Sequence, residues 1–136
     1  MIGRLHHVVL DCPDPDALAS FYSELVGLPV TYRSADWVVI AKNDTTSGIA
    51  FQRAPDYQPP QWPDPGRPQQ FHLDVMVDDV EAAGRDVLAL GARELSRDPD
   101  RYRIYADPAG HPFCLVTRPG WAPPVHPTGV RMIPGG

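Results

Sequence analysis

The spacing of hydrophobic residues at the start of the chain changes from that of a strand to that of a helix. Leu5–Cys12 is rich in Val and Leu and is followed by two prolines, which is typical of a strand and its end. A helix is expected next, which Asp14 or Asp16 can cap and Gly27 can end. Its apolar residues recur at helical spacing, at Leu18, Phe21, Tyr22 and Leu25.

Seven further segments are expected to be strands, and one more is expected to be a helix. Asp79 is placed to cap this second helix, and Gly91 is placed to end it. Most of the strand candidates are rich in β-branched or aromatic residues and lie between turn residues. They are Val30–Arg33, Trp37–Lys42, Gly48–Arg53, Gln70–Val77, Ala92–Leu95, Tyr102–Ala106 and Phe113–Thr117.

The order of these elements repeats along the chain. Strand, helix, glycine and three strands occur twice, and nearly the same spacing separates His7 from His72 and Gly27 from Gly91. We therefore predict an α+β fold of two tandem βαβββ modules, in which a curved mixed sheet surrounds a cavity. The predicted domain covers 4–118, with module one at 4–53, a connector at 54–69, module two at 70–118, and a Pro/Gly-rich tail at 119–136.

The charge of the chain limits its classes of partner. Twelve basic and 17 acidic side chains give a net charge of −5 among 136 residues. Nucleic-acid binding depends on dense Lys and Arg, and anionic membrane surfaces also attract basic segments, so we expect neither partner. Two cysteines argue against a disulfide scaffold, and no apolar run has the length of a spanning helix. We expect a cytoplasmic protein without a signal peptide.

Proline is the outlier in the composition, with 17 residues against a usual share of about 5%. Six of these prolines lie in the connector, so that neither a strand nor a helix can run through it. We expect an extended segment that is either a simple link or a lid over a site.

Several segments of the chain resemble one superfamily. Near its start the chain contains HHVVLDCPDPDALASFYSELVGLPV, which resembles the opening of a vicinal-oxygen-chelate domain. Its second half contains FHLDVMVDDVEAAGRDVLALGA, which is similar to the second module of that domain, and YADPAGHPFCLV, which is similar to its closing turn and strand. This superfamily includes glyoxalase I, bleomycin-resistance proteins and extradiol dioxygenases. Its glyoxalase-like domain subgroup is closer still, on the segments GIAFQRAPDY, FHLDVMVDD and DPAGHPFCLV. The resemblance covers about residues 4–118 and implies the fold, while the reactions of the superfamily are diverse.

The resemblance also implies where a divalent metal would bind. Enzymes of the superfamily hold one with a His on the first strand, a Glu on the fourth, a His on the fifth and a Glu on the eighth. The matching positions here are His7, Gln52, His72 and Cys114. Both carboxylates are absent, which removes most of the charge that neutralises a divalent cation. We therefore predict no metal and no other cofactor, with a zinc ion held partly by a Cys114 thiolate as the alternative.

Strand alternation and the resemblance together predict a ligand cavity. Alternation places His7 with Val9 and Asp11 on one face of the first strand, and His72 with Asp74 on one face of the fifth. The resemblance implies that these faces line the hollow. The predicted lining is His7, Gln52, His72, Asp74 and Cys114.

Several of these side chains have more than one interpretation. The two histidines either line the cavity, hydrogen-bonded to each other or to a ligand, or bind a metal, or are buried without a function. Asp74 either binds a cationic ligand or acts as a base, or it pairs with Arg53 or Arg103, which we favour. His111 lies in a turn without a motif around it. Five aromatic residues either wall a pocket or fill the core, namely Trp37, Phe51, Tyr57, Trp62 and Tyr102.

Two functions follow from this pattern. The first is a glyoxalase-like protein that binds a small molecule in the cavity without the usual metal site. The alternative is a metal-dependent lyase, isomerase or dioxygenase acting on a small oxygenated substrate, and no catalytic residue is assigned. The resemblance also implies a homodimer, in which a tail with the apolar residues Trp121 and Ile133 packs across a neighbour or stays mobile.

Overall fold

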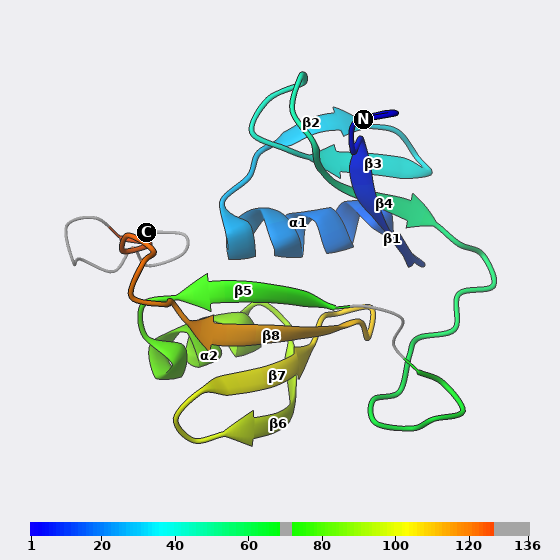
Figure 1. The fold of residues 1–136 in the computed structure, drawn as a ribbon. Coiled ribbons are helices and arrows are strands. Elements are labelled where there is room, and N and C mark those ends of the chain that lie inside the picture. Colours follow the sequence, from blue (N-terminus) through cyan, green and yellow to red (C-terminus); the bar gives the residue numbers. More distant parts are fainter. Residues whose placement is uncertain (69–71, 127–136) are drawn as a thin grey trace. The chain divides into compact units, whose positions relative to one another are not determined.

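The computed structural model describes residues 1–68 and 72–126, and the chain divides into two compact units. Unit 1 spans Met1–Gln58, and unit 2 spans Pro59–Gly136. Each unit has a helix after its first strand and a four-stranded sheet (Figure 1). The predicted α+β fold of two βαβββ modules is therefore confirmed.

Unit 1 pairs its first strand with its last. Its elements are β1 (His7–Cys12), α1 (Pro15–Val26), β2 (Val30–Arg33), β3 (Trp37–Ile40) and β4 (Gly48–Arg53). The sheet has the order β1-β4-β3-β2, in which β1 and β4 run parallel and the other pairs run antiparallel. A parallel pair requires a long crossover, and the segment from α1 to β3 supplies it.

Helix α1 covers one face of this sheet. Asp14 caps the helix, with its side chain accepting a backbone N–H of the first turn at 3.2 Å. Gly27 ends the helix in the left-handed conformation, at a φ of 70°, as the sequence predicts. The buried ring of Tyr22 stacks on Phe51 of β4 with 5.5 Å between ring centroids. Cys12 is fully buried, as expected for a packing residue.

Unit 2 repeats this arrangement. Its elements are β5 (Leu73–Val77), α2 (Val80–Ala89), β6 (Arg93–Asp98), β7 (Tyr102–Ala106) and β8 (Pro112–Thr117), and its sheet has the order β5-β8-β7-β6 with β5 and β8 parallel. Strand β6 continues beyond the predicted end at Leu95, because antiparallel pairing with β7 extends to Asp98. The predicted start of β5 at Gln70 lies outside the described residues.

Helix α2 lies close against its sheet. Asp79 caps it by accepting two backbone N–H groups, at 3.0 and 3.1 Å, and Gly91 follows its end at a φ of 108°. A Cβ on Gly84 would lie 2.5 Å from the hydroxyl of Tyr105, so glycine permits this approach of helix and strand. The ring of Tyr105 stacks in turn on Phe113, at 5.8 Å.

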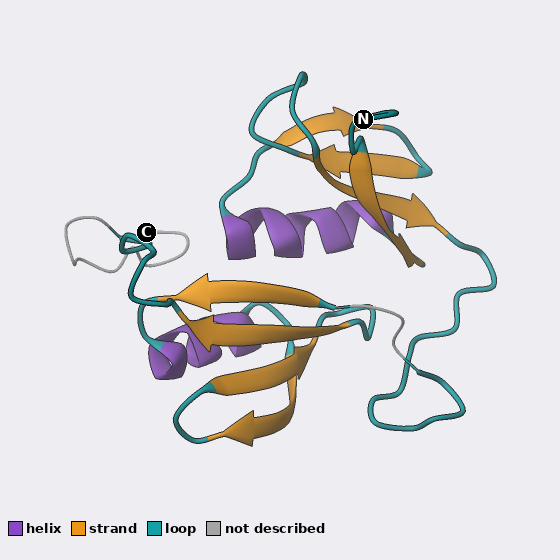
Figure 2. Cartoon of the chain, in the orientation of Figure 1, coloured by secondary structure: helices purple, strands orange, loops and turns teal. Residues whose placement is uncertain are grey.

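The connector folds into turns in the part that the structure describes (Figure 2). The N–H of Gln61 donates to the carbonyl of Arg67 at 2.8 Å, which closes a local loop. Pro59 packs near the turn before β8, since a Cβ on Gly110 would lie 2.8 Å from that of Pro59. These contacts replace the extended course that the sequence predicts. Residue 69 lies outside the described range.

The start of the predicted tail is held by one carboxylate. Asp78 accepts hydrogen bonds from Arg118 Nε and from the N–H groups of Val125 and His126, each at 2.9 to 3.0 Å. Arg118 also donates to the carbonyl of Ala122, which is buried. Residues 127–136, with Ile133, lie outside the described range. Across residues 1–68 and 72–126, no helix combines the length and the apolar character needed to cross a membrane.

Candidate functional site

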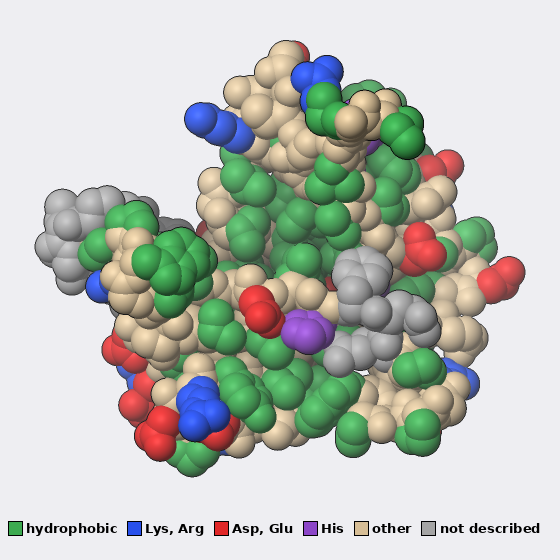
Figure 3. Space-filling view, viewed as in Figure 1, with side chains coloured by type: hydrophobic (Ala, Val, Ile, Leu, Met, Phe, Trp, Pro, Cys, Tyr) green, Lys and Arg blue, Asp and Glu red, His purple; other side chains and the backbone are tan. Residues whose placement is uncertain are grey.

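Three of the five predicted lining residues lie together on the open face of the unit 2 sheet, opposite α2. Asp74 on β5 pairs in register with Cys114 on β8, and His72 precedes β5 on the same face as Asp74 by strand alternation. One ligand atom from each residue lies within 4.8 Å of the other two. In the region of β5, a histidine is visible beside an acidic side chain with apolar side chains around them (Figure 3).

His72 and Asp74 form an ion pair. The Nε2 atom of His72 lies 3.1 Å from Oδ1 of Asp74. The two side chains are 40% and 60% exposed, so water screens the pair and its contribution to folding is small. Both groups are therefore accessible to a ligand from solvent.

The arginine partner that we favoured for Asp74 from the sequence is wrong. Arg53 pairs with Asp36 at 3.3 Å instead. A Cβ on Gly84 of α2 would lie 3.1 Å from Nη1 of Arg103, which places Arg103 on the helix-covered face of the sheet. Asp74 lies on the opposite face, so the sheet itself separates it from Arg103.

The thiol of Cys114 is held in its protonated form. Burial is the main cause that raises its pKa, and the charge of Asp74 and a hydrogen bond to the Asp74 carboxylate add to it, giving a pKa of about 11. The thiolate, not the thiol, is the metal ligand and the nucleophile. At neutral pH the free protein therefore presents Cys114 as a thiol, which is a weak nucleophile and a hydrogen-bond donor.

The other two predicted residues lie on the open face of the unit 1 sheet. The parallel register of β1 and β4 pairs His7 with Gly48 and Asp11 with Gln52. The cross-strand neighbour of Gln52 is thus Asp11, and His7 lies four residues further along the strand, roughly 13 Å away at about 3.3 Å per residue. His7 and Gln52 share a face without being neighbours. A single cavity lined by residues of both units remains a prediction.

His7 is held by backbone and ring contacts. Its Nδ1 accepts a hydrogen bond from the N–H of Gly48 at 3.0 Å. Its ring lies against that of His6, with 3.9 Å between centroids. Burial, and then the charge of His6, lower the pKa of His7 below its ordinary value.

The candidate aromatic residues divide between the core and the open faces. Phe51 is fully buried under α1 and belongs to the core. Trp37 pairs with Gln52 on the open face of unit 1 and packs against buried Val39. Tyr102 is 38% exposed on the open face of unit 2.

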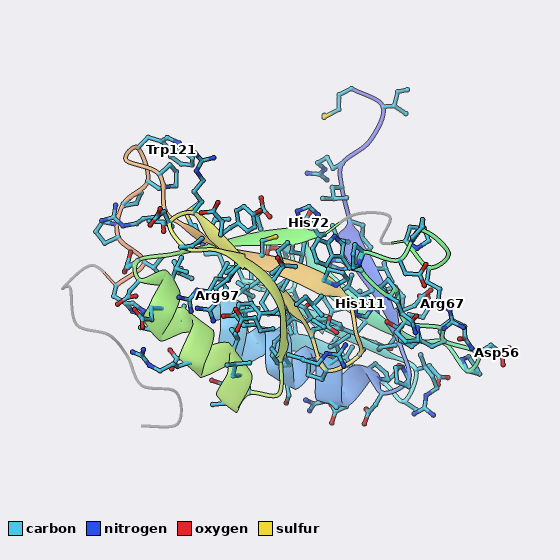
Figure 4. The ribbon with its side chains drawn as sticks, turned by 90° about the horizontal axis from the view of Figure 1, so that it is seen from below. Asp56, Arg67, His72, Arg97, His111 and Trp121 are labelled. Carbon is cyan, nitrogen blue, oxygen red and sulfur yellow. The ribbon has the colours of Figure 1, made fainter. Side chains whose placement is uncertain are left out.

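The sequence did not predict an Asp–His pair that the structure shows in unit 2. Nδ1 of His111 lies 2.7 Å from Oδ2 of Asp107, whose side chain is fully buried. Oδ1 of Asp107 also accepts the N–H groups of Ala109 and His111. Figure 4 labels this histidine, in the turn before β8, and His72, at the start of β5. The spacing of four residues in the Asp-Pro-Ala-Gly-His turn was the available signal.

Comparison with known proteins identifies the family. A sequence profile described as a glyoxalase-like domain matches residues 7–116. The chain belongs to the glyoxalase-like domain family. Among curated proteins, it is 29% identical over 160 residues to a 2-epi-5-epi-valiolone epimerase from Actinomyces sp., covering 94% of this chain and 86% of that protein.

Several solved structures share the fold of this glyoxalase-like chain. A glyoxalase-related enzyme from Fulvimarina pelagi matches with a TM-score of 0.65 at 19% identity, over 91% of this chain and 94% of that one. A fosfomycin resistance protein from Listeria monocytogenes matches with a TM-score of 0.64 at 17% identity, over 88% and 94%. At these identities the likeness concerns the fold alone.

The metal set of the superfamily does not fit the residues of this glyoxalase-like protein. Two carboxylate positions hold Gln52 and Cys114, and the Cys114 thiol is hydrogen-bonded to Asp74. The Nδ1 atom of His7 is occupied by a backbone N–H. None of the four positions of this set thus holds a carboxylate that would balance a divalent cation, and Asp74 is a neighbouring carboxylate outside the set.

Proposed function

We propose that this glyoxalase-like protein binds small molecules through side chains on the open face of a sheet, without the divalent metal site of the superfamily. The observation that carries the proposal is the replacement of both carboxylates of the superfamily's metal set by Gln52 and Cys114. Without them, most of the negative charge that would balance a divalent cation is missing. The pKa of the Cys114 thiol, raised to about 11 by burial and Asp74, agrees with a hydrogen-bonding role for this side chain in the free protein.

The open face of unit 2 has the composition of a small-molecule surface. The His72–Asp74 pair supplies polar groups that can fix the orientation of a ligand. Met76 on β5 and Tyr102 on β7 are 39% and 38% exposed on the same face and supply apolar contact. Apolar walls with a few placed polar groups are the usual features of a ligand site. We infer a ligand with one polar end and an apolar body.

A second candidate function is isomerisation of a small oxygenated molecule. The relative from Actinomyces sp. is named an epimerase, and an epimerase inverts one carbon centre. Inversion by proton transfer needs an acid and a base at that carbon. His72 and Asp74 are exposed groups of this kind, with Nε2 and Oδ1 3.1 Å apart. If the protein carries a metal, this candidate becomes the metal-dependent isomerase that the sequence gives as the alternative. Without a metal, the proton transfer depends on side chains alone.

The metal content of the protein separates the proposed function from the metal-dependent form of the second candidate. We expect elemental analysis of protein purified without chelator to give far less than one zinc, nickel, iron or manganese per chain. A library of small oxygenated compounds screened by ligand-observed NMR should yield binders, and His72→Ala should abolish their binding. His126→Ala is the matched control, because His126 contacts Asp78 through its backbone N–H rather than its ring.

The melting temperature of His72→Ala shows whether a loss of ligand binding comes from a loss of folding. Because His72 is 40% exposed, His72→Ala should lower the melting temperature by no more than a few degrees. One metal ion per chain that is lost in His72→Ala would contradict the proposal and support the metal-dependent alternative. A large loss of stability in His72→Ala would instead make His72 a structural residue.

A further inference from the structure

The hydrogen bond between Gly48 and His7 fixes which ring nitrogen of His7 carries a proton. A backbone N–H can only donate, and the N–H of Gly48 points at Nδ1 of His7 at 3.0 Å. Nδ1 must therefore be an acceptor without a proton. In a neutral imidazole one nitrogen is a donor and the other an acceptor, so the proton lies on Nε2.

This tautomer disables His7 as a metal ligand. A metal bound at Nε2 needs the lone pair of that atom, which moves the ring proton to Nδ1. Metal-bound histidines ordinarily donate this second N–H to a carbonyl or a carboxylate. Here the Nδ1 proton would instead face the donor N–H of Gly48, and the hydrogen bond would be lost.

The position of the Gly48 N–H is fixed by close packing. A Cβ on Gly48 would lie 2.0 Å from the carbonyl oxygen of Ile40 and 2.7 Å from the Cβ of Ala41. The preceding Ser47 donates its hydroxyl to the carbonyl of Leu5, two residues before His7. The chain on both sides of this hydrogen bond is thus tied to its neighbours, and β4 cannot turn its N–H away without repacking.

We propose that His7 is a hydrogen-bond donor, through Nε2–H, to an oxygen acceptor of a small molecule bound at the open face of the unit 1 sheet, and that it does not bind metal. This inference rests on the proposed function and adds the chemistry that the unit 1 face recognises. The ligand would present a carbonyl or similar oxygen to His7. The lowered pKa of the ring agrees with a neutral donor at neutral pH.

Long-range ¹H–¹⁵N NMR of the histidine rings tests the tautomer without any ligand. We expect the wild-type protein at neutral pH to show a protonated Nε2 and an unprotonated Nδ1 for His7. Added Zn²⁺ should leave both His7 nitrogens unchanged. His6→Gln is the control, since it removes the stacked ring but keeps the Gly48 hydrogen bond. A protonated Nδ1, or a His7 signal that Zn²⁺ shifts, would overturn the proposal.

Two variants of His7 test the donor role with cyclohexanone as the probe. His7→Gln keeps an N–H donor near the position of Nε2, whereas His7→Leu removes it. We expect the NMR-measured affinity for cyclohexanone to fall several-fold in His7→Leu and to return largely in His7→Gln. Equal affinities in the two variants, or no binding of the ketone to wild type, would overturn the donor role. The tautomer result stands apart from the proposed function, because it is read on the free protein.

Discussion

The carboxylate of Asp74 accepts a hydrogen bond from the thiol of Cys114, across the parallel pair of β5 and β8. The two residues are in register, so their side chains emerge side by side from the same face of the sheet. One consequence is chemical. A cysteine at a metal-ligand position of the superfamily is here the partner of a carboxylate that holds its proton in place.

The reactivity of Cys114 should report this contact directly. We expect its alkylation by iodoacetamide to be slow at pH 8 and to rise with a midpoint near pH 11, following the raised pKa of the thiol. Asp74→Asn removes the negative charge and should lower the pKa of Cys114 toward 9.0 while burial keeps it above that value. The rate at pH 8 should then increase, about tenfold for each unit of pKa. A midpoint near 9 in the wild-type protein would contradict the contact.

Gly48 and Gly27 should respond differently to alanine. At Gly48 a Cβ would collide with the carbonyl oxygen of Ile40, at 2.0 Å. We expect Gly48→Ala to cost about 3 kcal/mol, because the backbone of β3 and β4 must move apart. At Gly27 a Cβ meets nothing within 4 Å, and only the left-handed φ of 70° is unfavourable, at about 1–2 kcal/mol. Thermal melts of both variants measure the difference, and equal losses would refute the close approach.

Asp78 should control the order of the chain after β8. Asp78→Asn replaces one acceptor oxygen with an amide, so the N–H groups of Val125 and His126 should exchange with solvent faster in hydrogen-exchange measurements. Asp79→Asn is the matched control, because asparagine caps a helix as well as aspartate does. Protection of Val125 that survives Asp78→Asn would show that other contacts hold this segment, from which Trp121 projects (Figure 4).

The hydrogen bonds that Asp78 accepts should weaken in acid. Hydrogen bonds from Val125 and His126, together with Arg118, lower the pKa of Asp78 below 3.8 in the folded chain. A lowered folded-state pKa means that the stabilisation is fully present above pH 3.8 and is lost as the pH falls through the folded-state value. Protection of the two N–H groups should therefore be constant from pH 7 down to about pH 4 and should decline below it. A decline that begins near pH 6 would point to a histidine instead.

Asp107 should be among the most sensitive polar residues of unit 2. Its buried carboxylate accepts the N–H groups of Ala109 and His111 and contacts the His111 ring. Asp107→Ala leaves these donors without their partner, and we expect a loss of about 3 kcal/mol. Asp107→Asn keeps one oxygen and should lose less. Denaturant unfolding compares the two, and a neutral Asp107→Ala would show that the turn does not depend on this carboxylate.

The fold could be predicted because each local signal agrees with the repeat. Asp14 and Asp79 cap, and Gly27 and Gly91 follow the helix ends, as the residue types indicate. Strand β4 begins and ends where its turn residues predict. The local sequence does not predict a strand end that is set by pairing with a neighbouring strand. For this reason β6 continues beyond its predicted end, because its pairing with β7 extends to Asp98.

The candidate site was harder to predict, because side-chain partners depend on which face a strand presents. Alternation grouped His72 with Asp74 correctly. The expected partner of Asp74 was Arg53 or Arg103, but Arg53 pairs with Asp36 and Arg103 lies on the opposite face of the sheet. The Nδ1 contact of His7 depends on the register of β1 against β4. No spacing within one strand encodes such a register.

The pairing of first and last strands in each sheet also sets an order of events during synthesis. Strand β1 can pair with β4 only after β4 has been synthesised, and β5 can pair with β8 only after β8 has been synthesised. While the ribosome adds the intervening residues, each leading strand has an open edge that can pair with the wrong chain. Unit 1 can close as soon as Arg53 has emerged, before the first strand of unit 2 exists. While the proline-rich connector is being synthesised, no new strand is available that could compete with strand pairing inside unit 1.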